Sequence, residues 1–234
     1  MKPVVICRFA PHEGPGYFGT YLSKRGIPWR MIRIDEGEPL PPHEAISGVA
    51  MMGGPMSVND DLPWISPMLD LVRAAVAADV PVIGHCLGGQ LLSRALGGTV
   101  TRNHVKEIGW GEVEVLDDPA AAHWGATGSF LSYHWHGETF SIPHGATRIW
   151  SSTHCANQAF VLGRHLGMQC HIEITAELID DWCETGAQEI ESNLACSAAV
   201  QTAEAMHKDL DSKLEALRAV ADRVYDRWTA GLKG

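Results

Sequence analysis

One cysteine stands in a segment whose residue types suit nucleophilic chemistry: Gly-His-Cys-Leu-Gly-Gly-Gln at residues 84–90. An apolar run at residues 80–84 leads into it and a helical pattern follows, which predicts a sharp turn between a buried strand and a helix. Gly84 and Gly88 suit such a turn, because side chains there would clash where backbone packs on backbone. At a helix N-terminus, free N–H groups and the helix dipole favour the thiolate of Cys86. The segment therefore predicts a nucleophile, with a buried structural cysteine as the alternative.

A histidine and a glutamate that could serve this cysteine lie at His171 and Glu173. In an extended segment, residues two apart point to the same side of the chain. A cysteine nucleophile needs a base to take its proton and a carboxylate to hold that base in the right tautomer. The spacing predicts this role for the pair, and a solvated structural pair is the alternative.

A glycine-rich turn, Gly53-Gly54-Pro55, follows another predicted strand at residues 45–52. Ligand sites of open α/β sheets lie at the carboxyl ends of the strands, so this turn and Cys86 are expected to meet. Backbone N–H groups of the turn and of Leu87 would then point at the oxygen of a carbonyl under attack. Gln90, one helical turn beyond Cys86, is placed to contact the substrate. A plain turn at residues 53–55 is the alternative.

Strands and helices alternate along the first part of the chain. Strands are predicted at residues 3–7, 29–34, 45–52 and 80–84, and helices at 17–24, 67–78 and 90–96. This alternation predicts a parallel sheet that is covered on both faces. Shorter runs, expected to add antiparallel strands, follow at residues 111–116, 129–133, 147–151, 159–162 and 166–171. The fold class is therefore α/β.

The last part of the chain has a helical composition, with Thr175 as a predicted N-cap. Apolar residues recur in steps of three and four along one helix face: Ala203, Met206, Leu210, Leu214, Leu217, Ala221, Val224 and Trp228. This face is expected to pack on its own domain, and a dimer or partner contact is the alternative. We divide the chain into a domain at residues 1–182 and a helical extension at residues 183–234.

Composition excludes several classes of function. The chain has 234 residues, 45% of them apolar, and its 18 Lys and Arg against 28 Asp and Glu give a formal charge of −10. Disorder and nucleic-acid binding are not expected. No apolar run approaches the roughly 20 residues of a membrane span, and no signal peptide is indicated, so a soluble cytoplasmic protein is expected.

Metal sites and disulfides are not predicted. The six cysteines form no Cys-x-x-Cys pair, which argues against a zinc ribbon or a disulfide framework. His134 and His136 could offer a metal two ligands, but no carboxylate or thiolate stands nearby in a recognised spacing.

The segments described above together resemble the class I, or triad-type, glutamine amidotransferases, over residues 1 to about 182. The family's Gly-x-Cys-x-Gly-x-Gln pattern appears at residues 84–90 and its oxyanion loop at residues 53–55. Its His-Pro-Glu motif corresponds to residues 171–173, where Ile172 replaces the proline. The resemblance implies a flavodoxin-like three-layer α/β/α fold with a mostly parallel central sheet, antiparallel additions and a C-terminal helical extension.

Two further stretches, residues 106–110 and 136–140, look like those of a stand-alone branch similar to the amidotransferase domain of GMP synthase. In the family, backbone groups of the second stretch help to hold the amino-acid end of glutamine, which here implies Gly137 and Glu138. With Gly53 and Gln90 they are the predicted substrate-binding residues. His136 is expected to line the pocket or to have a structural role.

The resemblance implies hydrolysis of the glutamine side-chain amide. Cys86 would attack the amide, His171 oriented by Glu173 would move the proton, and the N–H groups of Gly54 and Leu87 would stabilise the oxyanion. No cofactor is required for this reaction.

Amidotransferases normally pass ammonia to a synthase. The chain after Trp182 contains no phosphate-binding loop of that kind, so a separate synthase subunit is expected to accept the ammonia. Hydrolysis of another γ-glutamyl amide or peptide, without an acceptor, is the alternative. A non-catalytic binding or regulatory protein on the same fold is a third interpretation.

Overall fold

A nine-stranded mixed sheet forms the centre of the molecule in the computed structural model, which describes residues 1–125 and 127–233. The parallel strands are, in sheet order, β2 (Trp29–Arg33), β1 (Val4–Arg8), β3 (Gly48–Met51), β4 (Val82–His85) and β9 (His165–Met168). The antiparallel strands continue from β9 as β8 (Ala159–Leu162), β7 (Thr147–Ser151), β5 (Val100–Val115) and β6 (Ser129–Phe140). The predicted mostly parallel core with antiparallel additions is confirmed.

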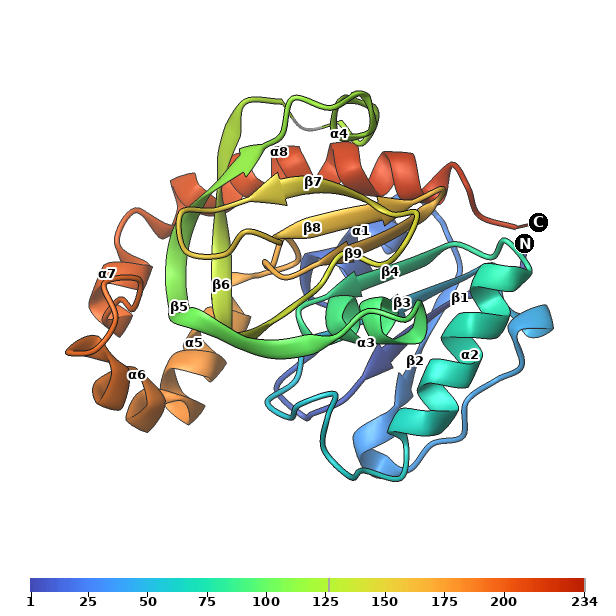
Figure 1. Cartoon of the computed structure of the whole chain (residues 1–234), viewed down its shortest axis with the longest axis horizontal. Helices are drawn as coiled ribbons and strands as arrows, with labels where there is room; N and C mark the ends of the chain where they lie inside the picture. Colours follow the sequence, from blue (N-terminus) through green and yellow to red (C-terminus); the bar gives the residue numbers. More distant parts are fainter. Residues whose placement is uncertain (126, 234) are drawn as a thin grey trace.

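Helices cover both faces of the sheet and give three layers (Figure 1). The covering helices are α1 (Gly16–Lys24), α2 (Ile65–Ala77), α3 (Leu87–Ala95) and α8 (Leu210–Thr229). Along β1 the side chains alternate between two cores, because successive residues of a strand point to opposite faces. Val4 and Ile6 pack in the core beneath α1 and α8, whereas Val5 and Cys7 pack in the core beneath α2 and α3.

The apolar face of α8 packs inside the chain's own core. Tyr225 and Trp228 are fully buried, and their rings meet the Phe18 ring of α1 at centroid distances of 4.8 and 5.6 Å. Burial of aromatic side chains of this size contributes strongly to stability. Within the described part of the chain, no helix is both long enough and apolar enough to cross a membrane.

Three shorter helices follow β9 in the chain and precede α8: α5 (Ala176–Thr185), α6 (Ala187–Leu194) and α7 (Ala203–His207). The Thr175 side chain accepts a hydrogen bond from the Leu178 N–H, which makes it the N-cap of α5 as the sequence predicts. Residue 182 lies inside α5, and the division of the chain at that position stays a prediction.

Two strands are longer than their patterns predict. β5 has 16 residues, although only residues 111–116 read as a strand, and β6 has 12, although the expected run was 129–133. The two pair as an antiparallel ribbon with an irregularity between Arg102 and Glu107. A bulge breaks the two-residue alternation on which strand prediction depends, so the polar first half of β5 gave no strand signal.

The remaining elements are short. They are the 3₁₀ turns Ile34–Glu36 and His43–Ala45 and the helix α4 (Pro119–His123). The second 3₁₀ turn occupies the start of the strand predicted at residues 45–52, and β3 begins only at Gly48.

Candidate active site

Cys86 occupies a strained turn between β4 and α3. Its φ of 48° and ψ of −106° lie in a region that non-glycine residues seldom adopt, a strain typical of functional sites. Its N–H donates to the Met168 carbonyl at 2.9 Å. A Cβ atom at Gly84 would stand 2.2 Å from the Gly88 carbonyl group, and one at Gly88 would stand 2.2 Å from the Met51 oxygen. Both glycines are therefore required where the turn packs on backbone.

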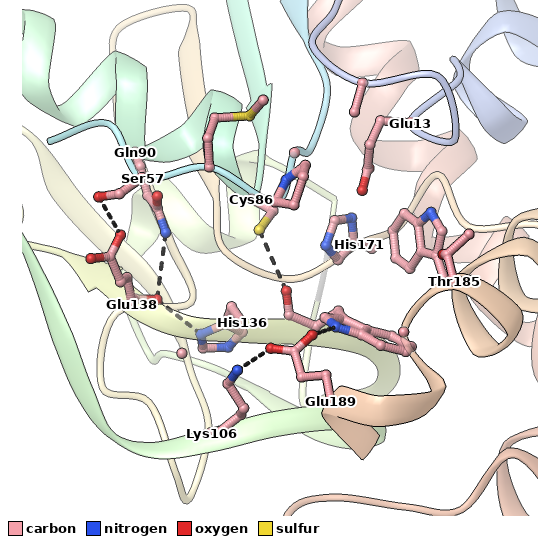
Figure 2. Close-up of a pocket in the computed structure, with 18 of the residues that line it drawn as sticks. Glu13, Ser57, Cys86, Gln90, Lys106, His136, Glu138, His171, Thr185 and Glu189 are labelled. Carbon is pink, nitrogen blue, oxygen red and sulfur yellow. Dashed lines mark hydrogen bonds and ion pairs between the residues drawn. The ribbon is translucent and has the colours of Figure 1, made fainter. Parts of the chain in front are cut away.

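The structure brings the predicted base and carboxylate to this cysteine. Figure 2 shows the His171 imidazole beside the Cys86 sulfur. His171 Nδ1 lies 2.6 Å from Glu173 Oε1, and both side chains are almost completely buried. No hydrogen-bond partner within the described chain engages His171 Nε2. With Nδ1 held by the carboxylate, Nε2 is the ring nitrogen able to exchange a proton with a thiol.

The electrostatics of this pair favour a charged histidine. Burial alone lowers the pKa of His171, but the Glu173 carboxylate and the Cys86 side chain raise it well above its usual 6.5. Burial raises the pKa of Glu173, yet the neighbouring His85 and His171 hold it below its usual 4.5. Glu173 is therefore ionised at neutral pH and able to stabilise an imidazolium at His171.

A second histidine supports the carboxylate from behind. His85 Nε2 lies 3.8 Å from Glu173 Oε2 and 3.1 Å from the Tyr225 hydroxyl of α8. All three side chains are buried, and burial lowers the pKa of His85. The contacts link the turn at Cys86 to the C-terminal helix through Glu173.

Two backbone donors lie at the nucleophile. Gly54 lines the cavity together with Cys86, and Leu87 is the first residue of α3. A Cβ atom at Gly54 would stand 2.8 Å from Leu87 Cδ2, so these two residues are packed together. Neither the Gly54 nor the Leu87 N–H donates to another group in residues 1–125 or 127–233. Free donors beside a nucleophile are able to stabilise an oxyanion.

Further contacts fix the sulfur itself. The Cys86 thiol points at the Trp135 carbonyl at 3.8 Å, and Gln169 Nε2 donates to Cys86 Sγ at 3.5 Å. Gln169 is fully buried and its Oε1 also accepts from Gln90 Nε2 at 3.2 Å. Donation from an amide N–H stabilises negative charge on sulfur.

A cavity of about 760 Å³ opens over Cys86. On one side of the cysteine it is lined by Gln90, His136, Gly137 and Glu138 (Figure 2). Gln90 Nε2 lies 3.5 Å from the Glu138 carbonyl, and the Glu138 carboxylate accepts from the Ser57 hydroxyl at 2.8 Å. Three of the four predicted substrate-binding residues therefore meet at the cavity.

The fourth, Gly53, lies apart from these three, beside Glu13 and His171. A Cβ atom there would stand 2.6 Å from Glu13 Oε2 and 3.1 Å from His171 Cε1, and Gly53 itself does not line the cavity. The absence of a side chain at Gly53 leaves room for Glu13 beside the histidine. This residue therefore shapes the site from outside.

On the other side of Cys86 the cavity is lined by side chains that the sequence did not single out: Glu13, Trp135, Trp182, Thr185 and Glu189 (Figure 2). The Trp182 ring packs edge-on against His171 at 4.8 Å and against Trp135 at 6.0 Å. α5 supplies Trp182 and Thr185 of this wall, and α6 supplies Glu189. No local motif identified it, because the wall forms only when the helices fold over the site.

A buried polar cluster corrects one prediction. A carboxylate does stand beside His134 and His136: Glu107, which β-pairing places opposite His136. Ligand atoms of the three residues lie within 4.8 Å of one another, and such a set suits zinc. The Glu107 carboxylate also accepts hydrogen bonds from Ser152 and Gln158, so the protein itself satisfies much of this cluster.

Comparisons with known proteins point to one family. The family model of class I glutamine amidotransferases matches residues 19–181. A glutamine amidotransferase-like protein of Salmonella typhimurium is 32% identical over 78% of this chain and 81% of its own length. A glutamine-hydrolysing GMP synthase of Aeropyrum pernix is 33% identical over 62% of this chain, which spans only 28% of that enzyme.

Solved structures are similar over the whole chain. A glutamine amidotransferase of Methylobacillus flagellatus is 46% identical, with a TM-score of 0.97, over 100% of this chain and 96% of its own. A glutamine amidotransferase of Thermotoga maritima is 26% identical, with a TM-score of 0.87, over 97% of each chain.

Proposed function

Because the chain belongs to the class I glutamine amidotransferase family, we propose that it hydrolyses the side-chain amide of glutamine through a thioester on Cys86. The observation that carries the proposal is the strained turn at Cys86, which lies beside the His171–Glu173 pair and opens, with His171 and Gly54, on one cavity.

The first half of the reaction forms the thioester. His171 takes the thiol proton, and the Cys86 sulfur attacks the amide carbon of glutamine. The Gly54 and Leu87 N–H groups stabilise the oxyanion, each such donor contributing about 3 kcal/mol in enzymes of this kind. The imidazolium of His171 then gives its proton to the leaving nitrogen, and ammonia departs as the carbon–nitrogen bond breaks.

The second half releases glutamate. His171 takes a proton from water, whose oxygen attacks the thioester carbon. The carbon–sulfur bond breaks, and the proton returns to Cys86. Glu173 holds the imidazole through both halves because its carboxylate accepts from Nδ1.

Binding of the amino-acid end of glutamine belongs to the same proposal. Gln90, Gly137 and Glu138 lie on the side of the cavity away from His171, where the α-carbon of a γ-bound substrate would sit. Glu138 offers a carboxylate to the α-ammonium group.

A separate synthase subunit that consumes ammonia is the partner that we propose for this activity. The GMP synthases to which the chain is similar are much longer, and the chain matches only a part of each. Co-purification of a partner that raises glutamate release would support this arrangement.

The test is release of glutamate and ammonia from glutamine by the purified chain. Cys86→Ser is expected to abolish release, whereas Cys196→Ser, which changes the exposed cysteine, is expected to retain it. Equal activity of the wild type and the Cys86→Ser variant would overturn the proposal.

A further inference from the structure

The cavity extends on the side where the leaving nitrogen must depart. A general acid has to reach the nitrogen that it protonates, so the leaving group lies on the His171 side of Cys86. Beyond His171 the cavity is lined by Glu13 and Thr185 (Figure 2) and by Trp182, whose ring packs against His171. We call this part, lined by Glu13, Trp135, Trp182, Thr185 and Glu189, the leaving-group lobe.

The size of the cavity exceeds the needs of glutamine. Glutamine has ten non-hydrogen atoms, and its leaving group is a single nitrogen. Cavities of roughly 300–1,000 Å³ take ligands of several times that size, and this one measures about 760 Å³. The chain's own α5 and α6 form the far wall of the lobe. A substituent on the leaving nitrogen would therefore find side chains of the protein beside it.

The chemistry of the lobe suits a cation. Two indole rings, Trp135 and Trp182, line it, and tryptophan is the best aromatic partner for a positive charge. The negative charge of Glu189 is already compensated, because its carboxylate pairs with the Lys106 ammonium group and accepts a hydrogen bond from Trp135 Nε1. Glu13 is different: its carboxyl group has no hydrogen bond or ion pair to any described residue.

The setting of Glu13 leaves its carboxyl group only partly compensated. It lies beside Gly53 and His171, and burial raises the pKa of Glu13 to about 8, although the His171 charge acts to lower it; the Glu173 charge raises it further. A carboxyl group in such a place is stabilised in its charged form when a cation binds next to it.

We propose that the leaving-group lobe binds the amine part of γ-glutamyl amides whose amine carries a second, positively charged nitrogen. The proposal rests on the proposed function, since the same Cys86 chemistry cleaves the bond. Water is consumed, the γ-glutamyl carbon–nitrogen bond breaks, and the products are glutamate and a diamine. Glu13 pairs with the charged nitrogen, and the two indole rings cover the alkyl chain.

The experiment compares matched substrates. N-(ω-aminoalkyl) γ-glutamyl amides with two, three and four methylenes are assayed beside uncharged N-alkyl amides of the same lengths and beside glutamine. We expect at least one aminoalkyl amide to have a kcat/KM about tenfold or more above its uncharged counterpart, as a charge-assisted contact would give. Glu13→Gln is expected to remove that ratio, whereas Glu184→Gln, at an exposed position outside the cavity, is expected to preserve it.

A second measurement does not depend on any variant. Diaminoalkanes are expected to inhibit glutamine hydrolysis by the wild type at concentrations about tenfold below those of the matched alkylamines. Equal kcat/KM for charged and uncharged amides, or equal inhibition by the two amine series, would overturn this proposal alone. Absence of turnover of every γ-glutamyl compound would overturn the proposed function as well.

Discussion

Glu173→Gln removes one charge from the buried centre of the site while it keeps the shape of the side chain. Glu173 Oε1 lies 2.6 Å from His171 Nδ1, and both residues are 2% exposed or less. In the proposed reaction His171 holds the thiol proton, and is a cation, while the bond between the Cys86 sulfur and the amide carbon forms. The carboxylate therefore contributes most when the imidazolium is present.

The magnitude follows from the type of contact. A hydrogen bond to a charged group is worth about 1.5–3 kcal/mol, which corresponds to a roughly 10- to 150-fold loss of kcat. A glutamine amide that donates to Nδ1 would also keep the histidine proton on Nε2, where it cannot accept from Cys86. The roughly 10-fold loss of kcat is therefore a lower bound, and the KM for glutamine is expected to change little.

The assay is glutamate release at saturating glutamine, measured by a coupled dehydrogenase. Glu177→Gln, at an exposed position on α5, is the matched control and is expected to keep wild-type kcat. A Glu173→Gln variant that is folded and loses less than about threefold in kcat would refute the reasoning.

Three more perturbations test the supporting structure. Tyr225→Phe leaves the buried His85 Nε2 without its hydroxyl partner, which is expected to lower the free energy of unfolding by about 1–3 kcal/mol and Tm by about 2–10 °C. Tyr21→Phe is the control, because it removes a hydroxyl that is hydrogen-bonded at the partly exposed edge of the same helix pair. An equal drop in Tm for the two variants would contradict the expected role of Tyr225. Gly84→Ala places a Cβ atom 2.2 Å from facing backbone and is expected to abolish glutamate release or soluble expression, whereas Gly14→Ala meets open space and should behave as wild type in both measurements. Burial lowers the pKa of His134 to about 4 from its usual 6.5, so on acidification the unfolded state binds a proton that the folded state excludes. The free energy of unfolding, measured with urea, is therefore expected to fall by up to about 3 kcal/mol from pH 6.5 to pH 4. A urea concentration at half-unfolding that does not change with pH would contradict this.

The residues around Cys86 were predictable because their signal is local. The turn needs glycine on both sides of the cysteine, and the 2.2 Å approaches at Gly84 and Gly88 show why no other residue fits. The two-residue spacing of His171 and Glu173 predicted only that they share a face, and the family resemblance assigned them to the site. The parallel half of the sheet followed from apolar runs that alternate with helices.

The residues that support and enclose the site were not predictable, because their partners are distant in the sequence. Tyr225 reaches His85 only when α8 packs against α1, and Glu13 meets His171 only across the Gly53 turn. The position of Glu107 beside His134 and His136 was not predictable for the same reason, since β-pairing and not spacing places it opposite His136. Such contacts depend on tertiary packing rather than on sequence periodicity.

The central claim is that Cys86 attacks the γ-carbonyl of a glutamine-like compound, and covalent labelling tests it most directly. Cys196, the exposed cysteine, is first changed to serine so that it does not compete for the reagent. The protein is then treated with the glutamine-like electrophile 6-diazo-5-oxo-L-norleucine, with and without excess glutamine, and the modified peptide is identified by mass spectrometry. We expect one adduct, on Cys86, that glutamine suppresses. An unmodified Cys86, or an adduct on another cysteine that glutamine does not suppress, would contradict it.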